Sequence, residues 1–512
     1  MLSGAPPDVS IAVGPTHIVE TTNVKAMIFT RAGALLSTTS LATFFSATSG
    51  YKLTDPHVLF DGPSGRFFLV MVGYNDTTNT GAWWIAVSTS SNPTGTWNTW
   101  QYTEPGTFPD FPAIGINDDK FVLSDNGFSL PGLTTFQGTQ FFVFNKADLI
   151  GGASVPRNAF AGLNLGHFTI QPAQSLSSST TIYMASNDFA TSFTFWQVNG
   201  LPGVSTVTTA TSTLAFGGTT TPPSAVQLGS VRPIDTGDYR FLQTVWIDAK
   251  LWISGNTGCV PSGDSTTRSC AHFVQVNTAT PAVIQDFSFG QASSYYYFPA
   301  IALDSAENLT TIFSRSSSAE SAGLRYASRL ASDPVNTLQG SVLLKAGNGP
   351  YTCTFCATRN RWGDFFGAAL DPVDTAKIWI AGEYAKVTTA PACGGCTTGD
   401  QWGTYVAQVQ VTSPLTPCTA VALSPSPASP QAPGTSVLWT AVATGCTSPQ
   451  FRFFVFNGAT GWTIAQEWSS SATFSWNTTG LAAGSYTIEA WVRADTTGTY
   501  QAVSPDVPYT LR

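Results

Sequence analysis

A repeated layout constrains the fold of this 512-residue chain more than any other feature. Seven copies share a polar or aromatic lead-in, a short apolar strand, a turn that often holds Asp or Gly, a second apolar strand and a polar exit. They begin near residues 6, 54, 108, 166, 236, 295 and 361, at intervals of 48 to 70 residues. Repeats of this length are typical of the four-stranded blades of a β-propeller. The copies read "PPDVSIAVGPTHIVETTN", "TDPHVLFDGPSGRFFLVMVGYN", "FPDFPAIGINDDKFVLSDN", "GHFTIQPAQSLSSSTTIYMASND", "TGDYRFLQTVWIDAKLWISGN", "YYYFPAIALDSAENLTTIFSRS" and "RWGDFFGAALDPVDTAKIWIAGEY".

The composition fits a fold built from strands. Aromatic residues make up 12% of the chain and charged residues only 10%, and strand formers are separated by Gly, Pro, Ser and Thr, which favours an all-β protein. No stretch keeps the 3.6-residue period of an amphipathic helix. We therefore predict that residues 1–412 form a seven-bladed β-propeller. Because the seventh copy has three clear strands before Pro-rich sequence, we expect the strand that closes the ring to be short or truncated.

The last hundred residues differ from the repeats. From Pro414 the sequence becomes Pro-rich and then alternates in short strands such as "FRFFVFN" and "GSYTIEAWVRA". Short alternating strands over about 95 residues are typical of an immunoglobulin-like β-sandwich. We predict such a domain over residues 413–512.

Eight cysteines occur as four close pairs. Their even number, the scarcity of Lys and the abundance of Ser and Thr favour an oxidising compartment, so we predict disulfides and a secreted or cell-surface protein. The two C-x-x-C pairs leave a zinc site or a redox pair as alternatives; their 36-residue separation is longer than in common zinc ribbons, and no βαβ unit surrounds them. The predicted disulfide cysteines are Cys259, Cys270, Cys353, Cys356, Cys393, Cys396, Cys418 and Cys446.

Several classes of protein are excluded. The net charge of -8 and the lack of a basic cluster argue against a nucleic-acid partner. No apolar run reaches the length of about 18 residues that a membrane-spanning helix needs, and we expect a monomer. The opening "MLSGAPPD" lacks a charged segment followed by an apolar one, so we expect no signal peptide in this sequence.

The repeats resemble a known group of proteins. "PPDVSIAVGPTHIVETTN", "DPHVLFDGPSGRFFLV", "FPDFPAIGINDDKFVLS" and "RWGDFFGAALDPVD" are similar to segments of secreted bacterial seven-bladed propellers with a sialidase-like architecture. The stretch from "SPSPASPQAPGTSV" to "SYTIEAWVRA" resembles an accessory immunoglobulin-like domain of secreted bacterial proteins. The resemblance covers nearly the whole chain and implies fold and secretion. It brings no agreed activity, so the function must come from the site.

Propeller topology predicts where chemistry gathers. The inner strand of a blade starts at one face of the ring and the second strand returns there, so lead-ins and exits should surround one mouth of the channel. Carboxylates in such a group could act as acid and base or nucleophile in glycoside hydrolysis, or bind Ca²⁺. Isolated Asp residues in lead-ins also commonly bond their own turn backbone. The predicted catalytic residues are Asp55, Asp110, Asp364 and, in reserve, Glu383; the predicted metal ligands are Asp8, Asp55, Asp110 and Asp364.

Cationic and aromatic residues on consecutive repeats suggest a ligand. Arginines with nearby tyrosines could grip the carboxylate of an acidic sugar, although ion pairs between blades would explain the arginines equally well. Repeated S-x-D-x-G-x-T-W turns and an Arg-Ile-Pro signature are missing, which argues against a sialidase, and His167 is placed to line the channel. The predicted ligand-binding residues are Arg240, Arg315, Arg361, Tyr296, Tyr297 and His167.

These features give two competing functions. The first is a secreted bacterial protein that binds, and hydrolyses if it is an enzyme, an extracellular polysaccharide or other glycan in the propeller funnel. The alternative is a non-catalytic adhesion module with a structural cation. A lyase or peptidase is a distant third because the sequence lacks a Ser-His or zinc-binding motif.

Overall fold

A computed structural model describes most of the chain as two compact units, Met1–Val411 and Thr412–Arg512. Strands dominate both units, and the two helices among the described residues, α1 (Leu41–Phe44) and α2 (Lys146–Gly151), are short. The prediction of an all-β chain is therefore confirmed. The residues described are 6–47, 50–155, 159–352, 360–387, 400–412, 416–494 and 499–512.

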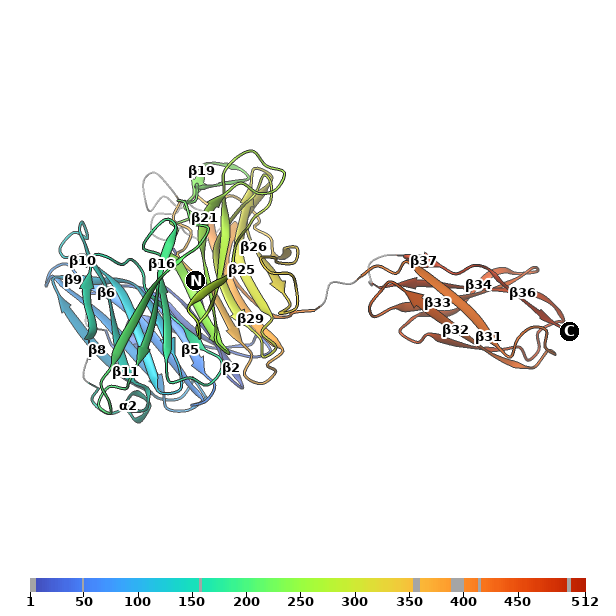
Figure 1. The fold of residues 1–512 in the computed structure, drawn as a ribbon, viewed down its shortest axis with the longest axis horizontal. Helices are drawn as coiled ribbons and strands as arrows, with labels where there is room; N and C mark the ends of the chain where they lie inside the picture. The colour runs from blue at the N-terminus through green and yellow to red at the C-terminus, as the bar shows by residue number, and fades with distance from the viewer. Residues whose placement is uncertain are drawn as a thin grey trace. The chain divides into compact units, whose positions relative to one another are not determined.

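The first unit consists of consecutive antiparallel sheets, fanned side by side in Figure 1. Each sheet follows the chain from an inner to an outer strand, and the last has three strands among the described residues. The first three sheets contain β1 (Ser10–Val13), β2 (His17–Thr22), β3 (Lys25–Thr30) and β4 (Leu35–Ser40); β5 (Lys52–Asp61), β6 (Arg66–Asn75), β7 (Thr80–Ser88) and β8 (Trp97–Pro105); and β9 (Thr107–Ile116), β10 (Lys120–Ser129), β11 (Phe136–Asn145) and β12 (Ala159–Asn164).

The later sheets repeat this order, with two short additions. The strand β14 (Gln174–Ser175) pairs in parallel with β9 and β20, and β18 (Ala225–Gln227) forms a hairpin with β19 (Ser230–Ile234). The main sheets contain β13 (Gln171–Pro172), β15 (Ile182–Ser186), β16 (Ser192–Asn199) and β17 (Thr208–Ala215); β20 (Phe241–Ile247), β21 (Lys250–Cys259), β22 (Arg268–Asn277) and β23 (Ala282–Phe289); β24 (Tyr295–Leu303), β25 (Leu309–Ser317), β26 (Glu320–Arg329) and β27 (Val342–Lys345); and β28 (Gly367–Leu370), β29 (Lys377–Val387) and β30 (Asp400–Gln410).

The inner strands form a closed ring. Each contacts the inner strand of the next sheet in the order β1, β5, β9, β13, β20, β24 and β28, and β28 returns to β1. Large side chains fill the spaces between sheets; Trp83 of β7, for example, packs on Phe142 of β11 with ring centroids 4.9 Å apart. At the centre the strands lie so close that a Cβ on Gly367 would be 2.7 Å from the backbone N of Ile11. Small residues in β28 are therefore a steric requirement of the ring.

The seam between the first and last sheets is closed by side chains. No strand among the described residues is shared by these two sheets, and side chains join them at both ends of the seam. At one end of the seam Asp8 accepts a hydrogen bond from the backbone N–H of Asp364, at 2.7 Å. At the other, Arg31 pairs with Asp371, a fully buried carboxylate in the turn after β28.

The second unit is a sandwich of two sheets. One contains β31 (Ala420–Ser426), β32 (Ser436–Thr444) and β35 (Thr473–Asn477); the other contains β33 (Gln450–Asn457), β34 (Gly461–Ser469), β36 (Gly484–Arg493), β37 (Ala502–Val503) and β38 (Val507–Leu511). Both contribute inward side chains to one core, including Trp439 from the first sheet and Phe453 from the second.

Two of the predicted disulfides are present. Cys259–Cys270 links β21 to β22, and Cys418–Cys446 joins the start of β31 to the end of β32. Both are compatible with an extracellular protein. The four cysteines Cys353, Cys356, Cys393 and Cys396 lie outside the described residues. No helix that the structure describes is long and apolar enough to cross a membrane.

We predict that the variant Asp371→Ala loses about 3 kcal/mol of unfolding free energy, because the carboxylate accepts hydrogen bonds from Arg31, Trp379 and Gln408 that would be left unmade. These bonds lower the pKa of Asp371 to about 2, against the opposing effect of burial. Its contribution should therefore be complete above the unfolded-state pKa near 4 and disappear as the pH falls through 2. Denaturant unfolding of both proteins tests this.

The control is Asp374→Ala, which removes an exposed carboxylate from the same turn. Its unfolding midpoint should stay close to that of the parent protein, because exposed ion pairs contribute little. Equal destabilisation by both substitutions would contradict the role given to Asp371.

Candidate functional site

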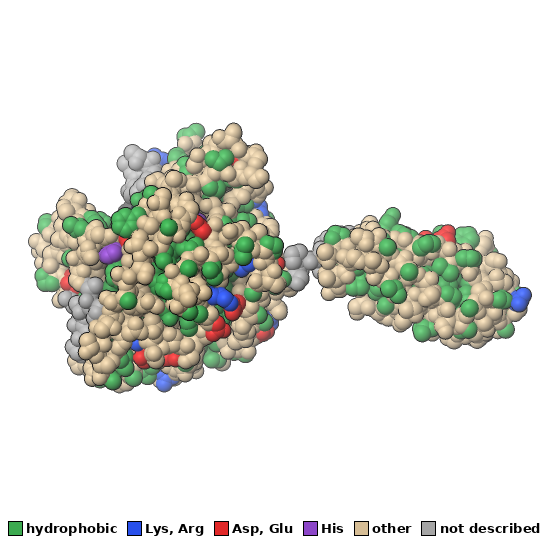
Figure 2. All heavy atoms as spheres, in the orientation of Figure 1, with side chains coloured by type: hydrophobic (Ala, Val, Ile, Leu, Met, Phe, Trp, Pro, Cys, Tyr) green, Lys and Arg blue, Asp and Glu red, His purple; other side chains and the backbone are tan. Residues whose placement is uncertain are grey.

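One large pocket lies where the lead-ins of five sheets meet. Its volume is about 710 Å³ and its walls come from the segments that enter β1, β5, β9, β20 and β28. Six of the chain's 30 acidic residues line it, together with three basic residues and the aromatic side chains of Tyr74, Phe108 and Phe111. Most of the face shown in Figure 2 is covered by hydrophobic and uncharged polar side chains. The acidic residues of the pocket are Asp8, Asp55, Asp110, Asp235, Asp238 and Asp364.

A left-handed backbone residue lies just before β1 and within the first half of β5 and β9, where these segments line the pocket. Asp8, Asp55 and Phe111 have φ angles of 48°, 53° and 52°. Such angles cost energy in residues other than Gly, and Asp tolerates them better than most because its short side chain bonds locally. The conformation therefore persists because the neighbouring sheet holds it in place.

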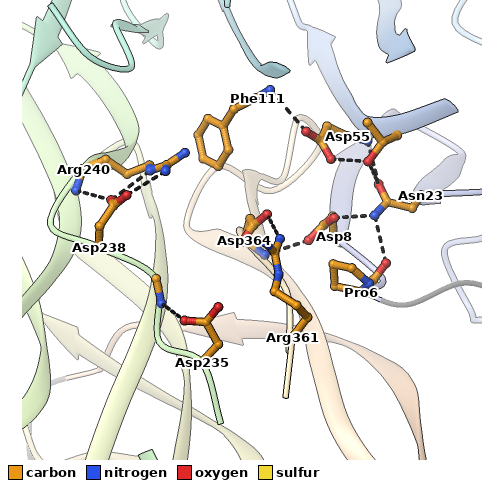
Figure 3. A network of polar contacts seen from close by, with 12 residues as sticks. Pro6, Asp8, Asn23, Asp55, Phe111, Asp235, Asp238, Arg240, Arg361 and Asp364 are labelled. Atoms are coloured by element: carbon orange, nitrogen blue, oxygen red, sulfur yellow. Dashed lines mark hydrogen bonds and ion pairs between the residues drawn. The ribbon is translucent and has the colours of Figure 1, made fainter. Parts of the chain in front are cut away.

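Hydrogen bonds from one sheet to the next provide that support (Figure 3). The side-chain oxygen of Asn23 accepts from the N–H of Asp55 at 2.6 Å, and a carboxylate oxygen of Asp55 accepts from the N–H of Phe111 at 3.2 Å. Asn23 also donates to Asp8, which in turn accepts from the N–H of Asp364. These bonds join the first, second, third and last sheets in series, and we call the bonded residues Asp8, Asn23, Asp55, Phe111 and Asp364 the mouth network.

The two arginines of the pocket pair with carboxylates from their own lead-ins. Arg361 pairs with Asp364, and Arg240 makes two hydrogen bonds to Asp238 at 2.9 and 2.7 Å. The guanidinium of Arg240 also lies 4.5 Å from the ring centre of Phe111 and 4.7 Å from that of Phe168. Both cations are therefore held by the protein itself, and they contribute more to the shape of the wall than to free positive charge.

Three pocket carboxyls have raised pKa values. Burial, followed by repulsion from Asp55, raises the pKa of Asp110 to about 7, although Arg240 opposes this. Burial and repulsion from Asp364 raise the pKa of Asp55 to about 6, and the same two causes raise the pKa of Asp8 well above its usual range. No hydrogen bond to the Asp110 carboxyl is found among the described residues. This carboxyl lines the pocket, and its pKa of about 7 keeps part of it protonated at neutral pH.

Glu383 lies behind the pocket wall. Its side chain is completely buried, and neither carboxyl oxygen has a hydrogen-bond partner among the described residues. A Cβ on Gly363 would lie 2.9 Å from one of these oxygens and 3.5 Å from an oxygen of Asp8, so both carboxyls lie beside Gly363. Burial and then Asp8 raise the pKa of Glu383 strongly. This predicted reserve acid does not reach the pocket.

Three predicted ligand-binding residues of one sheet also lie away from the pocket. Arg315 bonds to Glu320 and Gln291, and Tyr296 packs against Phe313 with 1% of its surface exposed. Tyr297 is fully buried and donates to the hydroxyl of Ser316. Their sheet does not contribute to the pocket wall, which explains the difference from the sequence-based expectation.

His167 is also elsewhere. One ring nitrogen lies 2.9 Å from Asp188, whose carboxylate further accepts from Ser186 and Thr194. The ring packs edge-on against Trp196. The fourth sheet holds this histidine at its own lead-in, outside the channel wall, so we remove it from the set of ligand-binding candidates.

The predicted calcium ligands do not form a cation site in this structure. Asp8, Asp55, Asp110 and Asp364 all line the pocket, but no three His, Cys, Asp or Glu side chains in the described part of the chain are placed to hold one metal ion. The reason lies in their partners, because Asn23, Thr54 and backbone N–H groups occupy oxygens of Asp8 and Asp55. We therefore do not assign calcium to the pocket.

Sequence reasoning missed part of the wall. Asp235 and the aromatic residues Tyr74 and Phe108 line the pocket but were not selected as candidates. The stretch "FPDFP" around Asp110 could have indicated the aromatic side of the pocket wall. The left-handed backbone of Phe111 brings Phe108 and Phe111 to the same pocket as Asp110. Tyr74 lies 4.8 Å from Phe108 between ring centroids.

Comparisons with known proteins give distant similarities. No family model matches the sequence, and no curated protein is similar to it in sequence. Similar solved structures include a protein of unknown function from Dyadobacter fermentans, with a TM-score of 0.37 and 10% identity, covering 70% of this chain and 95% of the other. The Dos1 propeller has a TM-score of 0.30 and 10% identity, covering 78% of this chain and 93% of its own.

An exo-β-1,3-galactanase from Clostridium thermocellum is also similar, with a TM-score of 0.28 and 10% identity over 79% of this chain and 95% of the enzyme. Structures similar to this chain thus include β-propeller proteins. At these TM-scores the similarities carry no argument about activity, which has to come from the pocket.

We predict that Asp110→Asn flattens the dependence of stability on pH. A carboxyl whose pKa is raised in the folded state binds more protons there than in the unfolded chain, so its contribution is complete below pH 4 and is lost as the pH rises through 7. The neutral Asn cannot lose a proton, so the variant should lose less unfolding free energy than the parent between pH 4 and 8. Denaturant unfolding at several pH values measures this.

Asp148→Asn serves as the control, since Asp148 is exposed on α2, outside the pocket. Its profile should run parallel to that of the parent. If Asp110→Asn also runs parallel, Asp110 does not carry the raised pKa.

Proposed function

We propose that the first unit is a seven-bladed β-propeller that binds an extracellular glycan in the mouth pocket and hydrolyses it with a pair of carboxyl groups. The second unit is an immunoglobulin-like domain, and the protein is a secreted or cell-surface monomer of bacterial origin. The domain boundary at residues 412 and 413 follows from the change in composition and is compatible with the division into two compact units.

The observation that carries this proposal is the convergence of carboxyl groups in one ligand-sized pocket. Asp55, Asp110 and Asp364 come from three separate sheets, yet all line the same cavity. Its volume of about 710 Å³ is within the range of about 300–1,000 Å³ that small-molecule sites occupy. The aromatic rings of Tyr74 and Phe108 supply apolar wall for the sugar faces, and the carboxyls accept hydrogen bonds from hydroxyl groups.

The environments of the carboxyls suggest separate roles. Asp110 holds a proton near neutrality, as a general acid for the leaving-group oxygen must. Asp364 is ion-paired with Arg361, and we assign it the role of base or nucleophile. In the reaction the glycosidic C–O bond breaks, Asp110 protonates the departing oxygen, and water supplies the hydroxyl of the new reducing end. Asp55 and Asp8 are positioning residues, because the mouth network holds them against the backbone.

The non-catalytic adhesion module is less well supported. It invoked a structural cation on Asp8, Asp55, Asp110 and Asp364, and these side chains are not arranged as a cation site among the described residues. A pocket with one protonated and one ion-paired carboxyl is better suited to acid–base chemistry.

We predict that Asp110→Asn and Asp364→Asn each lower kcat/KM for a hydrolysed polysaccharide by about 10²- to 10⁴-fold, the usual loss when a general acid or base is removed. A panel of soluble polysaccharides, followed by reducing-end release, identifies the substrate and measures the rates. Asp148→Asn should retain the parent activity. Binding without turnover by the parent protein would remove the hydrolytic part, and a lack of binding to every glycan in the panel would remove the whole proposal.

A matched pair of variants tests the mouth network. Asn23→Ala and Asn126→Ala each remove a side-chain oxygen that accepts from the N–H of a left-handed residue, Asp55 in one case and Thr169 in the other. The Thr169 N–H keeps the hydroxyl of Thr139 as an acceptor, but Asn126→Ala also removes the bonds of Asn126 to the hydroxyls of Thr139 and Thr169. Both variants should therefore cost about 1–3 kcal/mol of unfolding free energy. Only Asn23→Ala should also weaken glycan binding, because only Asn23 positions Asp8 and Asp55. Equal effects on binding, measured by calorimetry, would contradict this assignment.

A further inference from the structure

The larger sheet of the second unit carries aromatic side chains on the face that points away from the core. Along β33 and β36 every second residue is buried in the core, and the residues between them form the opposite face. Such an outward face is usually polar. Here it holds rings from β33, β34, β36 and the segment before β37, and we call them the aromatic face: Phe454, Phe456, Trp462, Trp468, Trp491 and Tyr500.

The rings of the aromatic face are open to solvent and already held in place. Trp462 is 44% exposed and packs on Phe456, with ring centroids 5.3 Å apart. Tyr500 is 46% exposed, and Trp491 lies 4.5 Å from Tyr500 and from Phe454 between ring centroids. A contiguous exposed apolar surface of this kind marks a site of interaction. Because the rings support one another, a ligand would bind them without first ordering them.

The charges beside the aromatic face do not suit an anionic partner. Two arginines and two glutamates lie on this side of the sheet, and Arg452 pairs with Glu467 at 2.8 Å. Residues 413–512 contain no Lys, and their three Arg are balanced by two Glu and two Asp. A membrane surface or an acidic polymer is attracted by an excess of cationic side chains around the apolar ones. The composition of the second unit provides no such excess.

Uncharged polar groups lie beside the rings. Ser485 and Thr487 alternate with core residues of β36 and so share the face of the rings, and Thr487 is the cross-strand neighbour of Phe456. A sugar has the matching surface, since its C–H groups are attracted to the negative face of an aromatic ring and its hydroxyls bond to other hydroxyl groups. The aromatic face thus complements an uncharged ligand that is apolar on its faces and polar at its edges.

We infer that the aromatic face binds an uncharged polysaccharide chain, whose sugar faces stack on Trp462, Trp491 and Tyr500. These rings come from β34, from β36 and from the segment before β37, so the polysaccharide lies across the strands of the sheet. The inference goes beyond the proposed function, because the mouth pocket belongs to the first unit and uses other residues. It gives the second unit the role of binding a polymer at a surface of its own.

Adsorption of the full chain to insoluble cellulose, chitin and β-1,3-glucan tests the inference. Depletion of the protein from the supernatant gives a dissociation constant for each polymer. We expect at least one of them to adsorb the protein, with a constant that changes less than about twofold between low and high salt, because salt screens only interactions between charges. Adsorption to none of the three, or adsorption only at low salt, would overturn the inference.

Matched pairs of variants locate the binding surface. Trp462→Ala and Tyr500→Ala should each weaken adsorption about tenfold, which corresponds to about 1.4 kcal/mol. Leu438→Ala and Val442→Ala are the controls, since they remove side chains of β32, in the other sheet, that are 44% and 58% exposed. These controls should adsorb as the parent protein does. Equal losses in both pairs would reveal unspecific apolar adsorption and overturn the inference, and melting temperatures verify that each variant is folded.

The mouth pocket and a second copy of the chain are the alternative explanations. Asn23→Ala, which should weaken binding in the mouth pocket, should leave adsorption unchanged; a loss would place the polymer in that pocket and overturn the inference. Sedimentation should give the same mass for the parent and for Trp462→Ala. A dimer that only the parent forms would show that the aromatic face pairs with a second copy, which would also overturn the inference.

The inference and the proposed function fail separately. If the protein adsorbs to none of the polymers but soluble glycans bind in the mouth pocket, the inference is wrong and the proposed function stands. If the protein adsorbs through Trp462 and Tyr500 and no glycan binds in the mouth pocket, the proposed function is wrong and the inference stands.

Discussion

The first unit depends on hydrogen bonds that the backbone N–H of a left-handed residue in one sheet donates to an Asn side-chain oxygen of the preceding sheet. Asn23 holds Asp55 in this way, Asn126 holds Thr169, and Asn256 holds Phe298. Each bond stabilises a backbone conformation that an isolated L-residue disfavours, and each also joins two neighbouring sheets. The device therefore sets the geometry of the inner strands and the cohesion of the ring at the same time.

The pocket arises where carboxylates take part in this device. Asp55 occupies the left-handed position itself and accepts from Phe111, while Asp8 accepts from Asp364 across the seam. These groups stay buried although burial and mutual repulsion raise their pKa values. The energy needed to keep them there is supplied by the backbone N–H groups that they accept from, and the same arrangement leaves Asp110 free to hold a proton.

Sequence alone was sufficient for the parts that repeat. The alternation of "GAAL" and "IWIAGEY" predicted β28 and β29, and the rule that lead-ins share one face predicted that Asp8, Asp55, Asp110 and Asp364 would lie together. The sequence was insufficient where a shift of one residue in strand register decides whether a side chain points into the pocket or into the core. Close to an irregularity between Tyr297 and Ala300, Tyr296 packs on Phe313 and Tyr297 on Phe298, and Glu383 of β29 is buried beside Gly363. The pairing of Arg240 with Asp238 and of Arg361 with Asp364 depends on side-chain rotamers, which the spacing of residues in the sequence does not specify.

The way the pocket is divided among lead-ins has an evolutionary consequence. The apolar clusters lie between neighbouring sheets, as those around Trp83 and Trp84 on the two faces of β7 show, and the pocket carboxyls are not part of them. A substitution at Asp110 or Asp364 therefore alters one wall without repacking the sheets beneath the others. In such a scaffold a single substitution in the pocket wall can change the ligand that is bound. Selection on the pocket residues is then almost independent of selection on the packing between the sheets.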